Sequence, residues 1–207
     1  DRWARGAWSC LIEPGDGVAG ALIAAFEAEA ALAVLGDGRP DAPEAGIDAA
    51  TLAGARKRWG PRLTTLADGF AAARRCRARL LTPADTDWPH RVDALGVHAP
   101  VCLWVRGAAG RLRAEDGAVA IVGARAATAY GEQMAAELAG GLAASGVTVV
   151  SGAAYGIDGA AHRAALRSGG PTIAVLAGGI DRPYPAGHVR LLDEIARDGV
   201  VTAEVPC

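Results

Sequence analysis

Three short apolar runs, each followed at once by a glycine turn, constrain the fold of this chain more than any other feature. The runs span 119–122, 147–150 and 172–176, and the turns after them contain Gly123, Gly152, Gly178 and Gly179. Stretches with helical periodicity separate the runs, and this alternation is typical of a parallel sheet wound with helices. We therefore predict an α/β fold whose sheet is mostly parallel.

The three glycine turns are predicted to meet at one edge of the sheet, because parallel strands end on the same side and ligands of such sheets bind there. Glycine lets the backbone approach a ligand closely and adopt a positive φ. Each following helix would add free N–H groups and the positive end of its dipole, which attract phosphate. One such turn is weak evidence, whereas three in register favour a phosphate-bearing ligand without identifying it.

The stretches around these runs predict the remaining elements of the sheet domain. Thr128 is predicted to cap a helix over 128–145, in which Met134, Leu138 and Leu142, with Ala135 and Ala139 beside them, would face the sheet. Further helices are expected over 158–168 and 189–197, and further strands over 101–105 and 200–204.

Residues before 80 have a different pattern and are predicted to form a small all-α domain. Helices are expected over 18–35, 47–59 and 64–80, with a loop rich in Gly, Pro and Asp between the first two. The predicted division of the chain is therefore 1–79 and 80–207. The strongest local positive charge comes from Arg74, Arg75, Arg77 and Arg79. We interpret it as the solvated end of a helix, where the dipole favours arginine, with a DNA-backbone patch as the alternative.

The composition is not that of a globally basic nucleic-acid binder. Lys and Arg number 21 against 23 Asp and Glu, so the formal net charge is −2 and any DNA contact must come from a local patch. The four cysteines are widely spaced and form no CxxC pair, which argues against a zinc site. The sequence shows neither a signal peptide nor a membrane-spanning run, so we expect a cytoplasmic location and no membrane contact.

An ordered set of short motifs runs through residues 118–206. The set comprises Ile121-Val122-Gly123-Ala124-Arg125, Tyr130-Gly131, Ser151-Gly152-Ala153-Ala154-Tyr155-Gly156-Ile157-Asp158, Ala161-His162, Gly169-Gly170, Ala174-Val175-Leu176-Ala177-Gly178-Gly179 and Tyr184-Pro185. In this order the motifs resemble those of the DprA/Smf family (DNA-processing protein A). The chain departs from the family pattern at His188, where an asparagine is usual, and at Ala203, where a serine is common.

The resemblance implies a Rossmann-like domain that binds single-stranded DNA, protects incoming DNA and helps to load the RecA recombinase in transformation and recombination. It also implies a homodimer for the full-length protein and, at 1–79, a module similar to sterile-alpha-motif or helix-hairpin-helix domains. Members of the family continue with further strands. We therefore expect residues 80–207 to stop before the C-terminal half of that domain.

Arg125 is the strongest candidate for a DNA contact. It follows Gly123 at the end of the first run, a guanidinium can grip a phosphate with two donors, and the family's matching arginine contacts single-stranded DNA. Ser151 could donate to phosphate or cap its strand, and Tyr155 could stack on a base or pack on its loop. The predicted DNA- and phosphate-binding residues are Gly123, Ala124, Arg125, Ser151, Gly152, Tyr155, Gly156, Arg163, Gly178 and Gly179.

The motifs do not favour catalysis. Asp158 is predicted to cap the helix after the second turn, and His162, one turn later, to make a hydrogen bond that fixes the loop. Asp181 and Arg182 are expected to pair with each other. No serine–histidine–acid set or metal set accompanies these residues, so we predict a non-enzymatic protein without catalytic residues, metal or cofactor. The alternatives are a nucleotide-binding hydrolase similar to nucleoside-monophosphate phosphoribohydrolases and, less favoured because 123–125 lacks the full G-x-G-x-x-G, a dinucleotide oxidoreductase.

Overall fold

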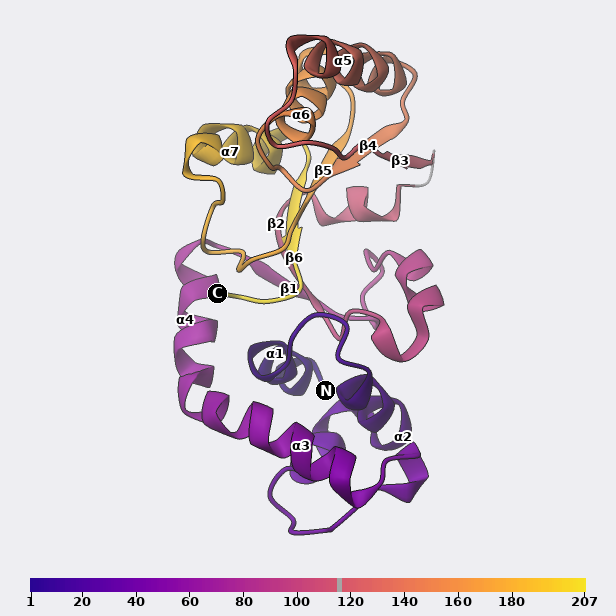
Figure 1. Cartoon of the computed structure of the whole chain (residues 1–207), viewed down its shortest axis with the longest axis vertical. Helices are drawn as coiled ribbons and strands as arrows, with labels where there is room; N and C mark the ends of the chain where they lie inside the picture. Colours follow the sequence, from indigo (N-terminus) through magenta and orange to yellow (C-terminus); the bar gives the residue numbers. More distant parts are fainter. Residues whose placement is uncertain (115–116) are drawn as a thin grey trace.

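The computed structural model describes residues 1–114 and 117–207, and Figure 1 shows a helical part below a sheet part. The helical part contains α1 (Arg2–Leu11), α2 (Gly17–Ala33), α3 (Ala49–Trp59) and α4 (Leu66–Arg75), with the 3-10 turns η1 (Pro43–Ala45) and η2 (Gly60–Thr65). The helices predicted over 18–35 and 47–59 are confirmed as α2 and α3. Asp16 caps α2 by accepting hydrogen bonds from two backbone N–H groups of its first turn.

The first helix and the end of the fourth differ from the sequence-based expectation. Helix α1 is absent from the prediction, although its apolar residues have helical spacing. Its buried side chains include Ala4, Trp8 and Leu11. The helix predicted over 64–80 is wrong at its end: α4 stops at Arg75, and Arg77 leaves it with a φ of 58°. The chain then forms a strand, because it pairs there with a second strand that lies more than twenty residues further on.

A six-stranded sheet forms the second part of the described chain and confirms the predicted α/β fold. Its strands are β1 (Arg79–Leu81), β2 (Leu103–Gly107), β3 (Ala118–Ala120), β4 (Thr148–Ser151), β5 (Thr172–Leu176) and β6 (Val200–Ala203), in the order β1-β2-β6-β5-β4-β3. The pairs from β3 to β6 are parallel, whereas β2 runs antiparallel to both of its neighbours. The sheet is therefore mostly parallel, as predicted.

Different elements cover the two faces of the sheet (Figure 1). On one face lie α5 (Ala129–Ala144), α6 (Ile157–Arg167) and α7 (Val189–Asp198), and on the other η3 (His90–His98) and η4 (Ala109–Arg113). Alternate residues of β5 show this division, because Ala174 and Leu176 pack with α7 whereas Ile173 packs with η4. Within the described residues, no helix is long and apolar enough to cross a membrane.

The face that α5 turns toward the core differs in part from the prediction. Thr128 caps the helix as predicted, because its Oγ1 accepts a hydrogen bond from the Gly131 N–H at 3.1 Å. The predicted core stripe is confirmed at Ala135 and Ala139 but wrong at Leu138, which is 59 % exposed. The buried residues of α5 are Ala135, Ala139 and Ala143. They pack against alanines of α6, and these small side chains let the two helices approach closely.

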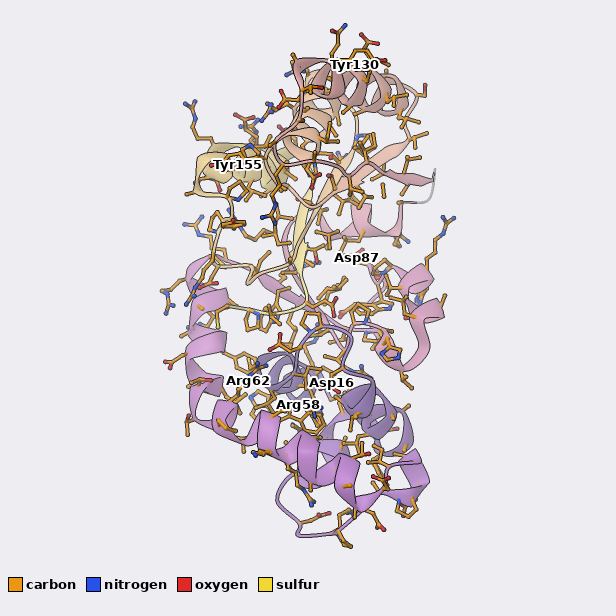
Figure 2. The ribbon with its side chains drawn as sticks, in the orientation of Figure 1. Asp16, Arg58, Arg62, Asp87, Tyr130 and Tyr155 are labelled. Carbon is orange, nitrogen blue, oxygen red and sulfur yellow. The ribbon has the colours of Figure 1, made fainter. Side chains whose placement is uncertain are left out.

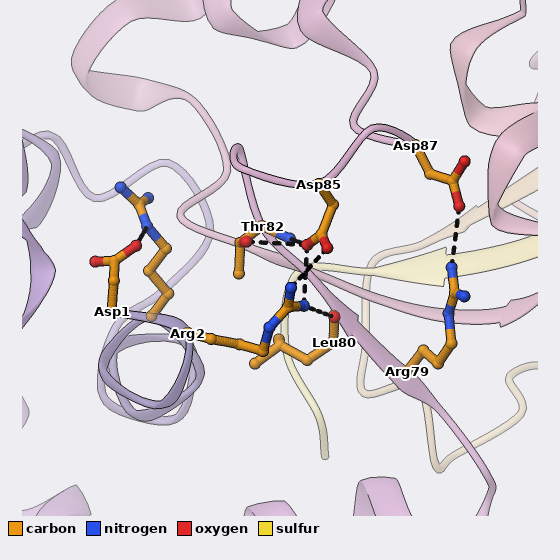
Figure 3. Close-up of polar contacts among 8 residues, drawn as sticks. Asp1, Arg2, Arg79, Leu80, Thr82, Asp85 and Asp87 are labelled. Carbon is orange, nitrogen blue, oxygen red and sulfur yellow. Dashed lines mark hydrogen bonds and ion pairs between the residues drawn. The ribbon is translucent and has the colours of Figure 1, made fainter.

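The helical part and the sheet part contact each other through aromatic and charged groups. Trp104 of β2 donates its Nε1–H to Ser9 Oγ of α1 at 3.0 Å, and its ring meets Phe70 of α4 edge-on at 5.7 Å. Figure 3 shows Arg2 pairing with Asp85 at 2.6 Å, and the hydrogen bond from Arg2 lowers the pKa of that carboxyl to about 2. The division into domains at residue 79 stays a prediction.

Candidate nucleic-acid interface

The three glycine turns meet at the edge of the sheet where β3, β4 and β5 end. The first and second turns are joined by a hydrogen bond from the Ile157 N–H to Ala124 O at 3.3 Å. Arg125 of the first turn reaches the loop that follows the third, because its guanidinium carbon lies 5.8 Å from the ring centroid of Tyr184. The predicted convergence of the turns is therefore confirmed.

A buried carboxylate occupies the space between the first two turns. Asp158, which is 5 % exposed, accepts hydrogen bonds from the backbone N–H groups of Gly123 at 3.3 Å, Gly152 at 3.1 Å and Ala154 at 3.4 Å. The predicted role of Asp158 as a helix cap is wrong, because α6 has Gly156 at its N-cap and no side-chain cap. The N–H groups of Gly123 and Gly152 already have an anionic partner, so a phosphate at this edge must bind farther out.

Two other residues of the predicted set shape the backbone of the edge. Ser151 is buried, and its hydroxyl donates to Ile121 O at 2.6 Å, which ties the end of β4 to the end of β3. Gly156 has a φ of +70°, and a Cβ there would collide with Ala124 O and lie 2.7 Å from Arg125 O. Gly156 is therefore required by the close approach of the first turn.

The third turn has its own packing constraint. A Cβ on Gly179 would collide with the backbone of Cys207, whereas the space around Gly178 is open. Next to this turn, the Ile180 N–H donates to Val205 O at 3.2 Å. Asp181 and Arg182 pair at 3.8 Å, as expected from the sequence. The turn is therefore fixed against the end of the described chain.

Arg125 and Tyr184 form the exposed centre of this edge. Arg125 is exposed and forms no ion pair among the residues that the structure describes. Its contact with Tyr184 has the geometry of a cation–π interaction. Tyr184 is 65 % exposed and was not in the predicted binding set. The Tyr184-Pro185 motif was the available signal, but a motif alone does not place a tyrosine beside an arginine sixty residues earlier.

Tyr155 lies on the loop that precedes α6 (Figure 2). Its ring is 48 % exposed and meets the ring of His188 edge-on at 4.9 Å, and its hydroxyl accepts from the Gly187 N–H at 3.3 Å. His188 is held by a bond from Nδ1 to Ala153 O at 2.9 Å. That bond leaves Nε2 as an acceptor for Arg163, 3.4 Å away. Arg163 therefore supports the Tyr155 loop and keeps its positive charge near the edge.

His162 lies outside the edge, between α6 and the sheet. It is fully buried, and its Nδ1 lies 2.8 Å from Thr172 Oγ1 of β5. Thr172 Oγ1 donates to Val149 O, so Nδ1 carries the proton that it shares with the threonine. Burial lowers the pKa of His162 to about 4. The expectation that His162 fixes the loop is wrong, because its partner belongs to a strand.

A parallel sheet whose glycine turns present an arginine and two tyrosines at its carboxyl edge defines a Rossmann-like domain with a surface chemically suited to nucleic acid. The family model for DNA recombination-mediator protein A matches residues 79–207. The chain therefore belongs to the DNA recombination-mediator protein A family, and the resemblance to the DprA/Smf family is confirmed.

Individual relatives and solved structures agree with this assignment. A putative DNA processing protein DprA of Mycobacterium tuberculosis (strain H37Rv) is 52 % identical over 151 residues, which cover 68 % of this chain and 39 % of that protein. The structure of DprA from Streptococcus pneumoniae matches with a TM-score of 0.62 and 31 % identity, over 79 % of this chain and 55 % of that one. DprA from Helicobacter pylori, whose single-stranded DNA binding mode has been described structurally, matches with a TM-score of 0.55 and 30 % identity, over 64 % of this chain and 58 % of that one. The chain thus spans about two fifths of the length of the mycobacterial relative that it matches.

Proposed function

We propose that this chain binds single-stranded DNA at the edge formed by the three glycine turns. In the full-length protein, we propose a homodimer that acts in the cytoplasm as a recombination mediator: it protects incoming DNA and helps to load the RecA recombinase in natural transformation. The observation that carries the DNA-binding proposal is the exposed Arg125 guanidinium over the exposed ring of Tyr184. The family and the single-stranded DNA bound by the Helicobacter pylori protein support it.

The edge is suited to a flexible strand rather than to a small phosphate ligand. The carboxylate of Asp158 accepts hydrogen bonds from the N–H groups of Gly123 and Gly152, which would otherwise be free to bind a phosphate. The available groups are the guanidinium of Arg125 and the faces of Tyr184 and Tyr155, which are spread over the surface. A guanidinium can bind the sugar–phosphate backbone, and an aromatic face can stack on any base. Binding would therefore tolerate different sequences and weaken with salt.

The hydrolase alternative needs an acid that faces a bound ribose. Asp158 is buried and its two oxygens accept three backbone N–H groups, so it serves the backbone rather than a substrate. Asp181 pairs with Arg182. We therefore propose a non-enzymatic binding protein that requires no cofactor.

The first test replaces Arg125 with alanine. Hydrogen bonds to charged groups contribute about 1.5–3 kcal/mol, so Arg125→Ala should weaken binding of a single-stranded oligonucleotide about tenfold or more at low salt. Fluorescence anisotropy with a labelled oligothymidylate measures this. Arg91→Ala, at an exposed arginine on η3, is the matched control and should bind as the wild type does.

Two outcomes would contradict the proposal. Equal binding by the wild type and Arg125→Ala would move the site away from this edge. Binding of a mononucleotide as tightly as of the oligonucleotide would favour the nucleotide-hydrolase class instead.

A further inference from the structure

A group of exposed arginines lies at the end of α4. Arg74 and Arg75 occupy its last turn, Arg77 follows with a φ of 58°, and all three are exposed. Arg79 pairs with Asp87 at 3.2 Å, but the other three form no ion pair with any residue in 1–114 or 117–207. We call Arg74, Arg75 and Arg77 the α4 basic end. In a chain with a net charge of −2, such a group is a local excess of positive charge.

The α4 basic end lies against the third glycine turn rather than apart from it. Figure 1 shows the end of α4 beside the loop that follows β5 and beside the C-terminus. Ala73 belongs to the same buried cluster as Ile180, which directly follows Gly179. A Cβ on Gly69, one helical turn before Ala73 in α4, would lie 3.2 Å from the side chain of Pro206. The end of α4 and the third turn, which are far apart in the sequence, thus pack against each other.

Arg182 connects the α4 basic end to the DNA-binding edge. Its side chain is 80 % exposed and pairs only loosely with Asp181, at 3.8 Å. Arg182 and Arg75 both act electrostatically on the thiol of Cys207, opposing the burial, Asp181 and Asp68 that raise its pKa. Cys207 lies against the third turn, because a Cβ on Gly179 would collide with its backbone. Arg182 is also two residues before Tyr184 in the sequence, so the same loop leads to the Arg125–Tyr184 centre.

We propose that the α4 basic end is a second phosphate-binding segment for the same DNA strand that crosses the Arg125–Tyr184 centre. This inference rests on the proposed function of that edge. The helix dipole accounts for arginine in the last turn of α4. It does not account for the packing of that turn against the third glycine turn, where Ala73 and Ile180 share one buried cluster. The helical part of the chain thereby takes part in DNA binding. Only a DNA strand long enough to extend from the Arg125–Tyr184 centre to the α4 basic end would contact it.

The test compares two oligothymidylates, of about 6 and about 20 nucleotides, one near the short end of the usual site sizes of single-strand binders and one longer than them. The double variant Arg74→Gln/Arg75→Gln should bind the short probe as the wild type does and the long probe more weakly. For the long probe, the slope of log K against log salt should fall by about 1.4, at about 0.7 for each lost phosphate contact. The ratio of the wild-type affinity to the variant affinity for the long probe should then fall about sevenfold between 50 and 200 mM salt.

The matched control is Lys57→Gln/Arg91→Gln, which removes two exposed charges from α3 and η3. A thermal unfolding curve checks that each variant is folded. Equal salt slopes for the double variant and the wild type on the long probe would overturn this inference, as would an equal loss in the control. If Arg125→Ala still weakens binding of the short probe, the proposed function stands in either case. If the wild type binds neither probe, both proposals fail.

Discussion

At the scale of single residues, Asp158 determines the shape of the binding edge. Its carboxylate is the shared acceptor for N–H groups from two turns that are 29 residues apart, at Gly123 and Gly152. A glycine-rich turn after a strand usually leaves such groups free for an anionic ligand. Here the chain provides the anion itself, so the turns are organised before any ligand binds, and the ligand meets side chains instead.

Replacing this carboxylate should destabilise the fold. Asp158→Ala leaves buried N–H groups of Gly123 and Gly152 without their acceptor, so the free energy of unfolding should fall by about 3 kcal/mol. Urea denaturation measures the change. Asp193→Ala is the control: this aspartate is exposed and pairs with Arg106, so its loss should cost less than about 1 kcal/mol. Equal stabilities of the two variants would contradict the assigned role.

His162 gives the protein a pH dependence that can be separated from that of the carboxylates. Burial lowers its pKa from 6.5 to about 4 in the folded protein. The unfolded chain therefore binds a proton first as the pH falls below 6.5, and the folded state loses stability until it too is protonated near pH 4. The expected loss between these limits is roughly 3 kcal/mol, with full stability above pH 6.5.

The variant His162→Gln should be less stable at pH 7 but should lose much less stability between pH 6.5 and 4.5. Unfolding free energies at a series of pH values test this. His90→Gln is the control, because His90 is exposed and its removal should leave the steep decline of the wild type in place. A decline that persists in His162→Gln would assign the pH dependence to another group.

The residue scale also shows how far sequence reasoning could go. The positions of Gly123, Gly156 and Arg125 at the turns could be predicted, because a strand, a glycine and a helix start have local signatures. The pairing of Arg125 with Tyr184 could not be predicted, because two turns must close before these side chains meet. DNA contacts at these residues stay a prediction.

At the scale of elements, the strands and helices of the sheet part follow the sequence pattern closely, and the core face of α5 follows it only at Ala135 and Ala139. Its larger residues would be expected inside on hydrophobicity alone. The opposite occurs because α5 packs mainly on α6, whose facing residues are alanines, and two alanine faces fit at short range. Leu138 is left 59 % exposed.

This arrangement predicts opposite effects at neighbouring positions of α5. Leu138→Gln should change the free energy of unfolding by less than about 0.5 kcal/mol, because the side chain is mostly solvated. Ala139→Leu should reduce it by about 1–3 kcal/mol, because Ala139 is fully buried against α6 and the added atoms overpack the contact. Thermal and urea unfolding of both variants test the assignment. A larger loss of unfolding free energy in Leu138→Gln than in Ala139→Leu would indicate that Leu138 lies on the core face of α5.

At the scale of the whole molecule, the helical part is bound into the sheet part rather than attached by a linker alone. Trp104, Phe70 and Ser9 join the two parts, and the end of α4 contributes Ala73 to a cluster that includes residues of α7 and β6. One consequence is that positive charge from the helical part lies next to the sheet edge. A chain with a net negative charge can thus carry a local excess of positive charge.

The sequence by itself determined the α/β class, the parallel strands β3 to β6, the glycine turns after them, and the family. These features depend on local periodicity and on residues such as Gly156 whose backbone conformation is unusual. The tertiary structure alone decided that Asp158 fills the turns, that Tyr184 joins Arg125, and that α4 ends beside the third turn. Each of these depends on contacts between segments distant in the chain, which form only when the sheet closes and packing selects one arrangement.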